Sequence, residues 1–214
     1  MPTSTSNSRA AGTIKLCYIT DRRALSPRPL LPRILGGVRA GVDMVQVREK
    51  DLPTRELVAL VKGAVTGAGG TATKIIVNDR LDVALALGSA GVHLGTQSMP
   101  PEVVRGIVRP DFLVGVSCHS LEDALRAEAS GANYVLLGPI FSTPSKMAYG
   151  PPLGLSTLQE TTARVKIPVF ALGGITVERA RICLEAGARG LAGISIFQYG
   201  DSLEDRVREL RGKF

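Results

Sequence analysis

The chain has 214 residues, of which 44% are hydrophobic, and its 24 glycines and 13 prolines indicate a folded domain with many turns rather than a disordered chain or a coiled coil. No run of about 18 consecutive apolar residues occurs, which argues against a membrane span. The 26 basic and 19 acidic residues leave a net charge of +7, which favours anionic partners; because the basic residues are dispersed and tryptophan is absent, a nucleic-acid surface is poorly supported.

Residues 1–13 are rich in serine and threonine and lack an apolar segment, so we expect a flexible tail rather than a secretory signal. We expect residues 14–214 to form one domain, because no composition shift or long linker interrupts them. The three cysteines, Cys17, Cys118 and Cys183, are an odd number at unrelated spacings. This favours small core thiols in a reducing cytoplasm over a disulfide framework.

Short apolar runs alternate with segments of helical periodicity along this domain. Gly41, Gly91, Gly131 and Gly187 stand in the small-residue turns before four of these runs, and each is predicted to close a helix. The runs are rich in β-branched residues, as in strands buried on both faces. The predicted strands are Lys15–Thr20, Asp43–Val47, Lys74–Val77, Val92–Leu94, Phe112–Val116, Tyr134–Gly138, Pro168–Leu172 and Gly190–Ile194. Helices are predicted near 29–40, 53–67, 80–88, 100–109, 120–130, 154–165, 176–187 and 201–211.

Several of these helices carry a start signal. Pro53 and Pro101 suit a first helical turn, and Ser120 and Thr176 are candidate N-caps. Alternating strands and helices predict a parallel sheet with right-handed crossovers. Eight such units in about 200 residues predict a single-domain α/β fold, the (β/α)8 TIM barrel. A doubly wound open sheet is the structural alternative.

In such barrels the active site lies at the carboxyl ends of the strands. Alternation along the second strand places Gln46, Arg48 and Lys50 on one side and Val47 and Glu49 on the other. Three polar groups on one side of a buried strand need partners, and an anionic ligand would supply them. The alternative is an ion-pair network inside the barrel.

The third strand leads into Asn78 and Asp79. A carboxylate beside an amide suits Mg2+, which binds one or two carboxylates, some waters and substrate phosphate oxygens. The alternative is that one of the two residues caps the helix that follows near Arg80.

The fifth strand ends in Ser117, Cys118 and His119. These residues lack the second glycine of a G-x-S-x-G nucleophile elbow, and the adjacent Cys118 and His119 should diverge, so a catalytic dyad is disfavoured. The Ser117 hydroxyl can bind a ligand or stabilise a turn. His93 is expected to be a packed, hydrogen-bonded imidazole rather than a catalyst. The G-x-G-x-x-A match at 67–72 follows a helix, the reverse of the dinucleotide-binding order.

The loops after strands six to eight complete the predicted site. Residues 138–152 form a long loop in which Thr143, Ser145 and Lys146 suit a phosphate or carboxylate, with a solvated surface loop as the alternative.

Strands seven and eight lead into Gly173-Gly174 and into Gly193, Ile194 and Ser195. By analogy with other barrels of this fold, backbone N–H groups in these two loops form a phosphate site.

The ordered set of these phrases resembles the thiamine-phosphate synthase family. The matching phrases, which span about residues 15–195, are Tyr18–Asp21, Gln46–Lys50, Asn78–Ala86, Gly91–Gly95, Gly115–His119, Gly138–Lys146 and Ala171–Ile175. No single phrase decides the resemblance, whereas the ordered set is highly specific.

The resemblance implies a cytoplasmic transferase that joins 4-amino-2-methyl-5-(diphosphooxymethyl)pyrimidine to thiazole phosphate or its carboxylate. Thiamine phosphate and pyrophosphate are the products. In this family the C–O bond is thought to break first, which gives a carbocation that the thiazole nitrogen captures. The resemblance is compatible with a homo-oligomer and implies neither a nucleic acid nor a membrane as partner.

The resemblance also implies a role for each candidate residue. Arg48, Lys50 and Lys146 are the implied catalytic residues. Implied ligands of the pyrimidine diphosphate or its leaving group are Gln46, Arg48, Lys50, Asn78, Ser117 and Lys146, those of the thiazole phosphate are Thr143, Ser145, Gly174, Ile194 and Ser195, and those of Mg2+ are Asp79 and Ser98.

Two positions bear on the activity that the resemblance implies. One departs from the usual family pattern, and the other distinguishes two branches of the family. Ser98 stands where the family usually has a second magnesium carboxylate, so weaker metal affinity or a non-catalytic sensor of thiazole or thiamine phosphate is an alternative. A related branch, the thiazole tautomerases, has a catalytic histidine at the position of Pro139, which counts against isomerisation here.

Overall fold

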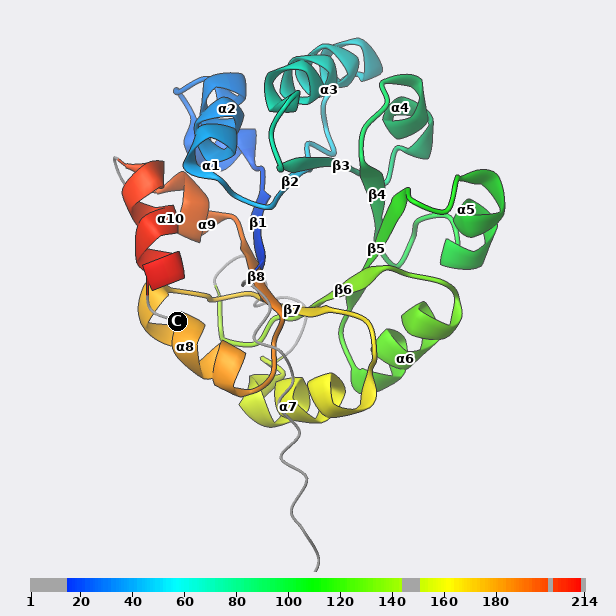
Figure 1. The fold of residues 1–214 in the computed structure, drawn as a ribbon, viewed down its shortest axis with the longest axis vertical. Helices are drawn as coiled ribbons and strands as arrows, with labels where there is room; N and C mark the ends of the chain where they lie inside the picture. Colours follow the sequence, from blue (N-terminus) through cyan, green and yellow to red (C-terminus); the bar gives the residue numbers. More distant parts are fainter. Residues whose placement is uncertain (1–14, 144–150, 200–201, 213–214) are drawn as a thin grey trace, which may run out of the picture.

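The computed structural model describes residues 15–143, 151–199 and 202–212, and its eight strands form one closed parallel barrel surrounded by helices (Figure 1). The strands pair in chain order, and the barrel closes where β1 pairs with β8. The strands are β1 (Lys15–Ile19), β2 (Met44–Val47), β3 (Lys74–Asn78), β4 (Gly91–Leu94), β5 (Leu113–Cys118), β6 (Tyr134–Leu137), β7 (Val169–Leu172) and β8 (Gly190–Gly193). The predicted TIM barrel is confirmed, and the open doubly wound sheet is wrong.

Every predicted helix is present within a few residues of its expected ends. Eight helices correspond to the prediction: α2 (Leu30–Ala40), α3 (Thr54–Ala68), α4 (Leu81–Ala86), α5 (Pro101–Ile107), α6 (Leu121–Ala129), α7 (Gly154–Arg164), α8 (Val177–Glu185) and α10 (Leu203–Gly212). Two further helices, α1 (Arg22–Leu25) and α9 (Ser195–Gln198), were not predicted. Each has four residues, which is too short for helical periodicity to be visible in the sequence.

Most of the predicted helix starts are confirmed. The Ser120 hydroxyl accepts a hydrogen bond from the Asp123 N–H, and Thr176 caps α8 in the same way. Pro101 is the first residue of α5, as predicted, whereas Pro53 lies one residue before α3 at the N-cap.

The prediction for Gly91 is wrong. The residue with a left-handed backbone after α4 is Gly88, with φ 62°, and Gly91 is the first residue of β4. A Cβ at position 91 would lie 2.2 Å from the Leu113 carbonyl oxygen. Close approach of β5 therefore explains this glycine, rather than a helix end.

Alternating strand residues divide the core into two layers. Leu16 and Tyr18 of β1 belong to the outer layer between strands and helices, whereas Cys17 and Ile19 belong to the layer inside the barrel. The inner layer consists of Cys17, Ile19, Met44, Ile76, Tyr134, Leu136, Phe170 and Ala192. Gly115 gives the Tyr134 ring its room, since a Cβ there would lie 2.1 Å from Tyr134 Cζ.

The three cysteines are free and buried, as predicted. Burial raises the pKa of Cys17 and Cys118 to about 12 and that of Cys183 to about 11, so these thiols stay protonated and serve the core.

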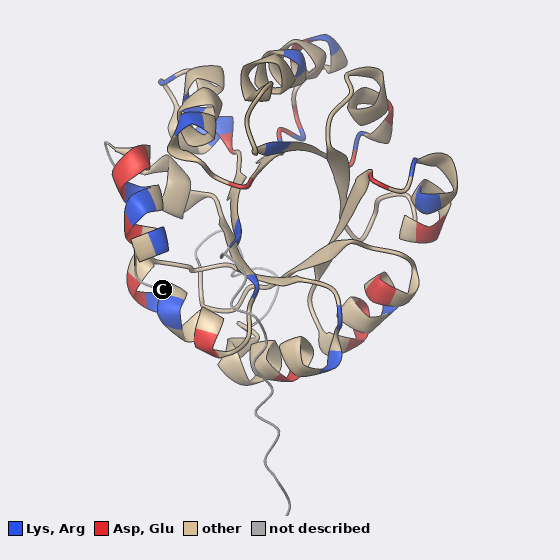
Figure 2. Cartoon of the chain, viewed as in Figure 1, with Lys and Arg blue, Asp and Glu red and all other residues tan. Residues whose placement is uncertain are grey.

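Charged residues of both signs are distributed around the ring of helices (Figure 2). Among the described residues, no helix is long and apolar enough to span a membrane.

Candidate functional site

Polar side chains replace apolar ones where β2 and β3 leave the barrel. Gln46 is two residues after the inward Met44, and Asn78 is two residues after the inward Ile76, so alternation turns both amides inward. The Gln46 amide donates from Nε2 to Asn78 Oδ1 over 2.9 Å. Gln46 is 2% exposed, and its Oε1 has no hydrogen-bond partner among the described residues. A buried acceptor at this mouth is therefore left for a donor on a ligand.

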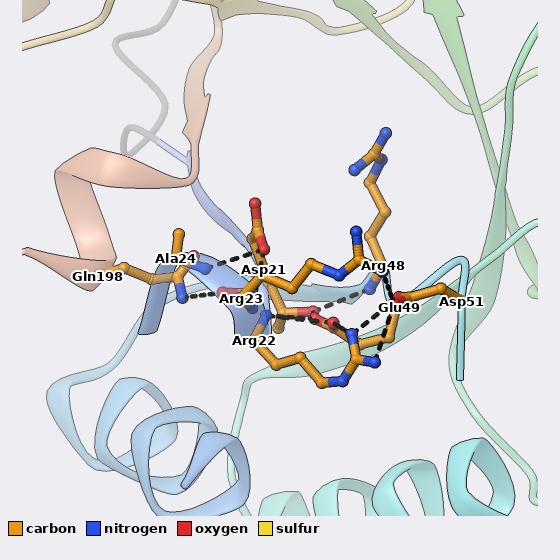
Figure 3. A network of polar contacts seen from close by, with 9 residues as sticks. Asp21, Arg22, Arg23, Ala24, Arg48, Glu49, Asp51 and Gln198 are labelled. Atoms are coloured by element: carbon orange, nitrogen blue, oxygen red, sulfur yellow. Dashed lines mark hydrogen bonds and ion pairs between the residues drawn. The ribbon is translucent and has the colours of Figure 1, made fainter. Parts of the chain in front are cut away.

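Arg48 follows Gln46 on the same side. Its side chain is half-buried, and the described part of the chain offers it neither an ion pair nor a hydrogen bond. Figure 3 shows its guanidinium extending away from the neighbouring polar network. Its positive charge acts on His93 inside the barrel. The alternative of an internal ion-pair network is therefore wrong for Arg48.

Glu49 faces the other way and has a complete set of partners. It accepts a hydrogen bond of 2.6 Å from the Thr20 hydroxyl and bonds of 3.1 and 3.2 Å from the Arg22 N–H. The Thr20 oxygen accepts in turn from the Arg48 N–H over 2.9 Å. Burial raises the pKa of Glu49, while the hydrogen bonds from Thr20 and Arg22 oppose that rise. This network ties the exit of β2 to that of β1 and so positions the Arg48 backbone.

The network continues outward through α1 (Figure 3). Arg22 donates hydrogen bonds from Nη1 and Nη2 to the two Asp51 carboxylate oxygens, over 2.8 and 2.9 Å, and these bonds lower the pKa of Asp51 to about 2. Asp21 caps α1 by accepting from the backbone N–H groups of Arg23 and Ala24. Sequence reasoning did not find this network, because its partners come from two strands.

Asp79 has an unusual backbone. Its φ is 65°, in the left-handed region that Asp tolerates better than most residues, and its N–H donates to the His93 carbonyl over 2.8 Å. The N-cap of α4 is Arg80, and this helix has no side-chain cap, so the capping alternative for Asn78 and Asp79 is wrong. The exposed Asp79 carboxylate makes no ion pair with a described residue, since Arg80 pairs with Asp82 instead.

Ser98 lies beyond β4, the strand next to β3. Its hydroxyl accepts a 2.8 Å hydrogen bond from the Gly95 N–H and closes the turn there. Within the described ranges, no group of three or more His, Cys, Asp or Glu side chains gathers for a metal. One free carboxylate at Asp79 still fits Mg2+ whose remaining ligands are water and phosphate oxygens. Zinc, which takes three or four protein ligands, does not fit these residues.

Ser117 meets the buried His93 inside the barrel. The Ser117 hydroxyl lies 2.9 Å from His93 Nε2, and the Tyr134 hydroxyl lies 3.3 Å from Nδ1. Burial, with a smaller contribution from Arg48, lowers the pKa of His93 to about 3. The imidazole is therefore neutral and packed, as predicted, and it orients the Ser117 hydroxyl.

The loop after β7 lies against the loop after β6, where the Phe141 N–H donates to the Gly173 carbonyl over 3.1 Å. Gly174 has φ 64°, and a Cβ there would lie 2.8 Å from Phe141 Cβ, so this position requires glycine. Its carbonyl accepts from Arg179 over 2.9 Å. Ile194 is the N-cap of α9 and Ser195 its first residue, so the N–H groups that open this helix have no partner within it.

Of the remaining predicted residues, the structure describes the positions of Lys50 and Thr143. Lys50 begins an exposed turn after β2, and Thr143 is half-buried after β6. Ser145 and Lys146 lie outside the described residues. The structure thus brings Gln46, Asn78, Arg48 and Ser117 to one mouth. The roles of these four residues and of the other candidates stay predictions.

Comparison with known proteins identifies the family. The profile described as thiamine monophosphate synthase matches residues 16–197. The chain belongs to this family. It is 44% identical over 177 residues to the thiamine-phosphate synthase of Roseiflexus sp. (strain RS-1), which covers 83% of this chain and 75% of the relative. It is 37% identical over 196 residues to the thiamine-phosphate synthase of Syntrophomonas wolfei, and this match covers 92% of this chain and 94% of the relative.

A solved structure agrees with this assignment. The thiamine phosphate pyrophosphorylase from Pyrococcus furiosus has a TM-score of 0.83 and 37% identity to this family member, and the match covers 94% of this chain and 95% of that one. The resemblance inferred from the ordered motifs is confirmed.

Proposed function

We propose that this chain is a thiamine-phosphate synthase, a transferase that condenses 4-amino-2-methyl-5-(diphosphooxymethyl)pyrimidine with thiazole phosphate or its carboxylate. The observation that carries the proposal is a pair of groups at one mouth, the Arg48 guanidinium and the Gln46 Oε1 atom, for which the described residues supply no partner. A diphosphate suits the first group and the amino group of a pyrimidine suits the second.

The chemistry needs little covalent help from the protein. The bond from the methylene carbon to the diphosphate oxygen breaks, and its electron pair leaves with pyrophosphate. The thiazole nitrogen then donates its lone pair to that carbon, which gives thiamine phosphate. When the acceptor is the carboxylate, its carboxyl group also leaves as CO2. The protein must neutralise the leaving charge and hold the acceptor nitrogen in line.

We assign the candidate residues to the three parts of the substrates that must be held. Arg48 and Lys50, with Lys146 from the loop after β6, hold the leaving diphosphate, and Gln46, Asn78 and Ser117 orient the pyrimidine. Thr143 and Ser145, with the backbone N–H groups at Gly174, Ile194 and Ser195, hold the thiazole phosphate. The neutral His93 holds Ser117 in place without carrying a positive charge.

Asp79 is the residue that would hold Mg2+, with Ser98 as a weak second ligand. When bound, the ion supplies positive charge against the phosphate oxygens. Asp79 is suited to this role because its carboxylate is exposed and is not held by Arg80.

The test is incubation of the purified protein with both substrates and Mg2+, followed by chromatographic detection of thiamine phosphate and pyrophosphate. Formation of both products in equal amounts, only when both substrates are present, is the expected result. Absence of product under conditions in which a related synthase works would overturn the proposal. Binding of either phosphate compound without turnover would favour the sensor alternative, which the turn-bound Ser98 hydroxyl motivates.

A further inference from the structure

A cavity lies at the mouth of the barrel opposite the candidate active site. Its volume is about 740 Å³, and the residues around it come from the amino ends of the strands and the loops that lead into them. Lys15, Met44, Lys74 and Tyr134 are the first residues of β1, β2, β3 and β6 and line it. Gln46, Asn78 and Ser117 lie at the carboxyl ends, so this cavity is separate from the candidate active site.

The floor of the cavity is apolar and aromatic. Met44, Tyr134 and Phe170 line it and are all buried. The rings of Tyr134 and Phe170 lie with their centroids 5.5 Å apart. The Tyr134 hydroxyl points into the barrel at His93, which leaves the carbon face of its ring to the cavity.

The single carboxylate among the lining residues is already paired. Asp43 accepts from Lys15 over 3.2 Å and from the Leu16 N–H over 2.8 Å. Arg211 also donates to Asp43 over 2.8 Å. The negative charge at this mouth is therefore used within the fold.

Three more cations surround the cavity. Lys74, Lys166 and Arg189 line it and are exposed. Within the described part of the chain, none of these three side chains makes an ion pair or a hydrogen bond. The described residues therefore leave the positive charge around the apolar floor of this cavity without a neutralising carboxylate.

We propose that this cavity binds a small organic anion with a flat apolar body, such as an aromatic sulfonate, carboxylate or phosphate monoester. The aromatic floor takes the body, and Lys74, Lys166 and Arg189 take the charge. The volume falls within the range of roughly 300–1,000 Å³ that small-molecule sites occupy. The proposal does not depend on the proposed function, because it concerns the other mouth of the barrel.

The test is a fluorescence titration of the full chain with 8-anilinonaphthalene-1-sulfonate, with the uncharged N-phenyl-1-naphthylamine as the matched probe. Three double variants that each remove two positive charges are compared. Lys74→Gln/Arg189→Gln alters the cavity, Arg48→Gln/Lys50→Gln alters the other mouth, and Arg55→Gln/Lys62→Gln alters two exposed residues of α3.

We expect saturable binding of the anionic probe to the wild-type chain. If each cation contributes about threefold to affinity, the cavity variant has a Kd roughly tenfold higher while the other two variants stay near the wild-type value. The neutral probe should bind all four proteins equally. Lys166→Gln, which changes one exposed side chain, gives a smaller weakening and serves if the double variant does not fold.

Three results would overturn the proposal. The first is the absence of saturable binding to the wild-type chain. The second is equal weakening in all three double variants, which would show a general effect of net charge. The third is weakening confined to Arg48→Gln/Lys50→Gln, which would place the probe at the candidate active site. Because the readout is binding rather than turnover, none of these results bears on the proposed synthase activity.

Discussion

The two sides of the β2 exit differ in how completely their polar groups are satisfied. On the outer side, the buried Glu49 carboxylate has bonds from Thr20 and Arg22. On the inner side, Arg48 has no described partner for its guanidinium, and the buried Oε1 of Gln46 is unsatisfied. Gln46 and Glu49 are both buried, so burial alone does not explain why only one of them is fully satisfied.

From this difference we infer that the outer side serves the fold and propose that the inner side serves a ligand. A buried polar group without a partner costs free energy of folding, and a fold retains it where a ligand completes the set. We therefore expect changes on the inner side to reduce activity with little loss of stability. Changes on the outer side should do the reverse.

The largest expected effect is at Asp79. Asp79→Asn removes the charge that would hold Mg2+ while it keeps the shape, so kcat should fall by about a hundredfold to a thousandfold in a pyrophosphate-release assay. Asp82→Asn is the matched control, since Asp82 lies three residues away and pairs with Arg80. Near-normal turnover of Asp79→Asn, or an equal loss in both variants, would contradict the site.

The buried His93 should make the stability of the fold depend on pH. Its folded pKa of about 3 lies below the unfolded value near 6.5, so the unfolded state binds the extra proton and stability falls as pH decreases through this window. His93→Gln should remove about 1.4 kcal/mol per pH unit from the slope of the unfolding free energy between about pH 6 and pH 4. Urea unfolding at several pH values measures this slope. An unchanged slope would mean that His93 is not buried as described.

The outer network should matter for stability. Thr20→Val or Glu49→Gln leaves buried donors or acceptors without partners and should lower the unfolding free energy by about 1–3 kcal/mol, measured by urea denaturation. Asp111→Asn, which disrupts an exposed pair with Arg109, should cost less than about 0.5 kcal/mol. If the Thr20 and Glu49 variants lose no more than this control, the network does not hold the two strand exits together.

The smallest effect concerns Ser98. Ser98→Asp adds a carboxylate near the predicted metal position and should lower the Mg2+ concentration for half-maximal activity by about tenfold. Ser98→Ala is the control, since it removes the hydroxyl and adds no charge. An unchanged magnesium titration for Ser98→Asp would place this residue away from the metal.

Local patterns in the sequence were sufficient for the barrel and for part of the site. Alternation along β2 predicted that Gln46 and Arg48 share a side, and the caps at Ser120 and Thr176 follow from local side-chain chemistry. The prediction at Gly91 failed because its cause is the close approach of a neighbouring strand, which a single segment does not reveal.

The outer network also could not be predicted from local sequence patterns. Thr20 and Glu49 are 29 residues apart and meet only when β1 pairs with β2. The contact of Ser117 with His93 likewise requires two different strands. Groups that are satisfied across strands can therefore be named only from the folded structure.

Calorimetric titration with inorganic pyrophosphate and Mg2+ tests the central comparison most directly. Arg48, which has no partner among the described residues, should bind the anion, so Arg48→Gln should raise the Kd by at least about tenfold. Glu49→Gln, one residue away and on the outer side, should keep the Kd within about threefold of the wild-type value while its thermal midpoint falls. Equal weakening by the two variants, or unchanged binding to Arg48→Gln, would contradict the assignment of the inner side to the ligand.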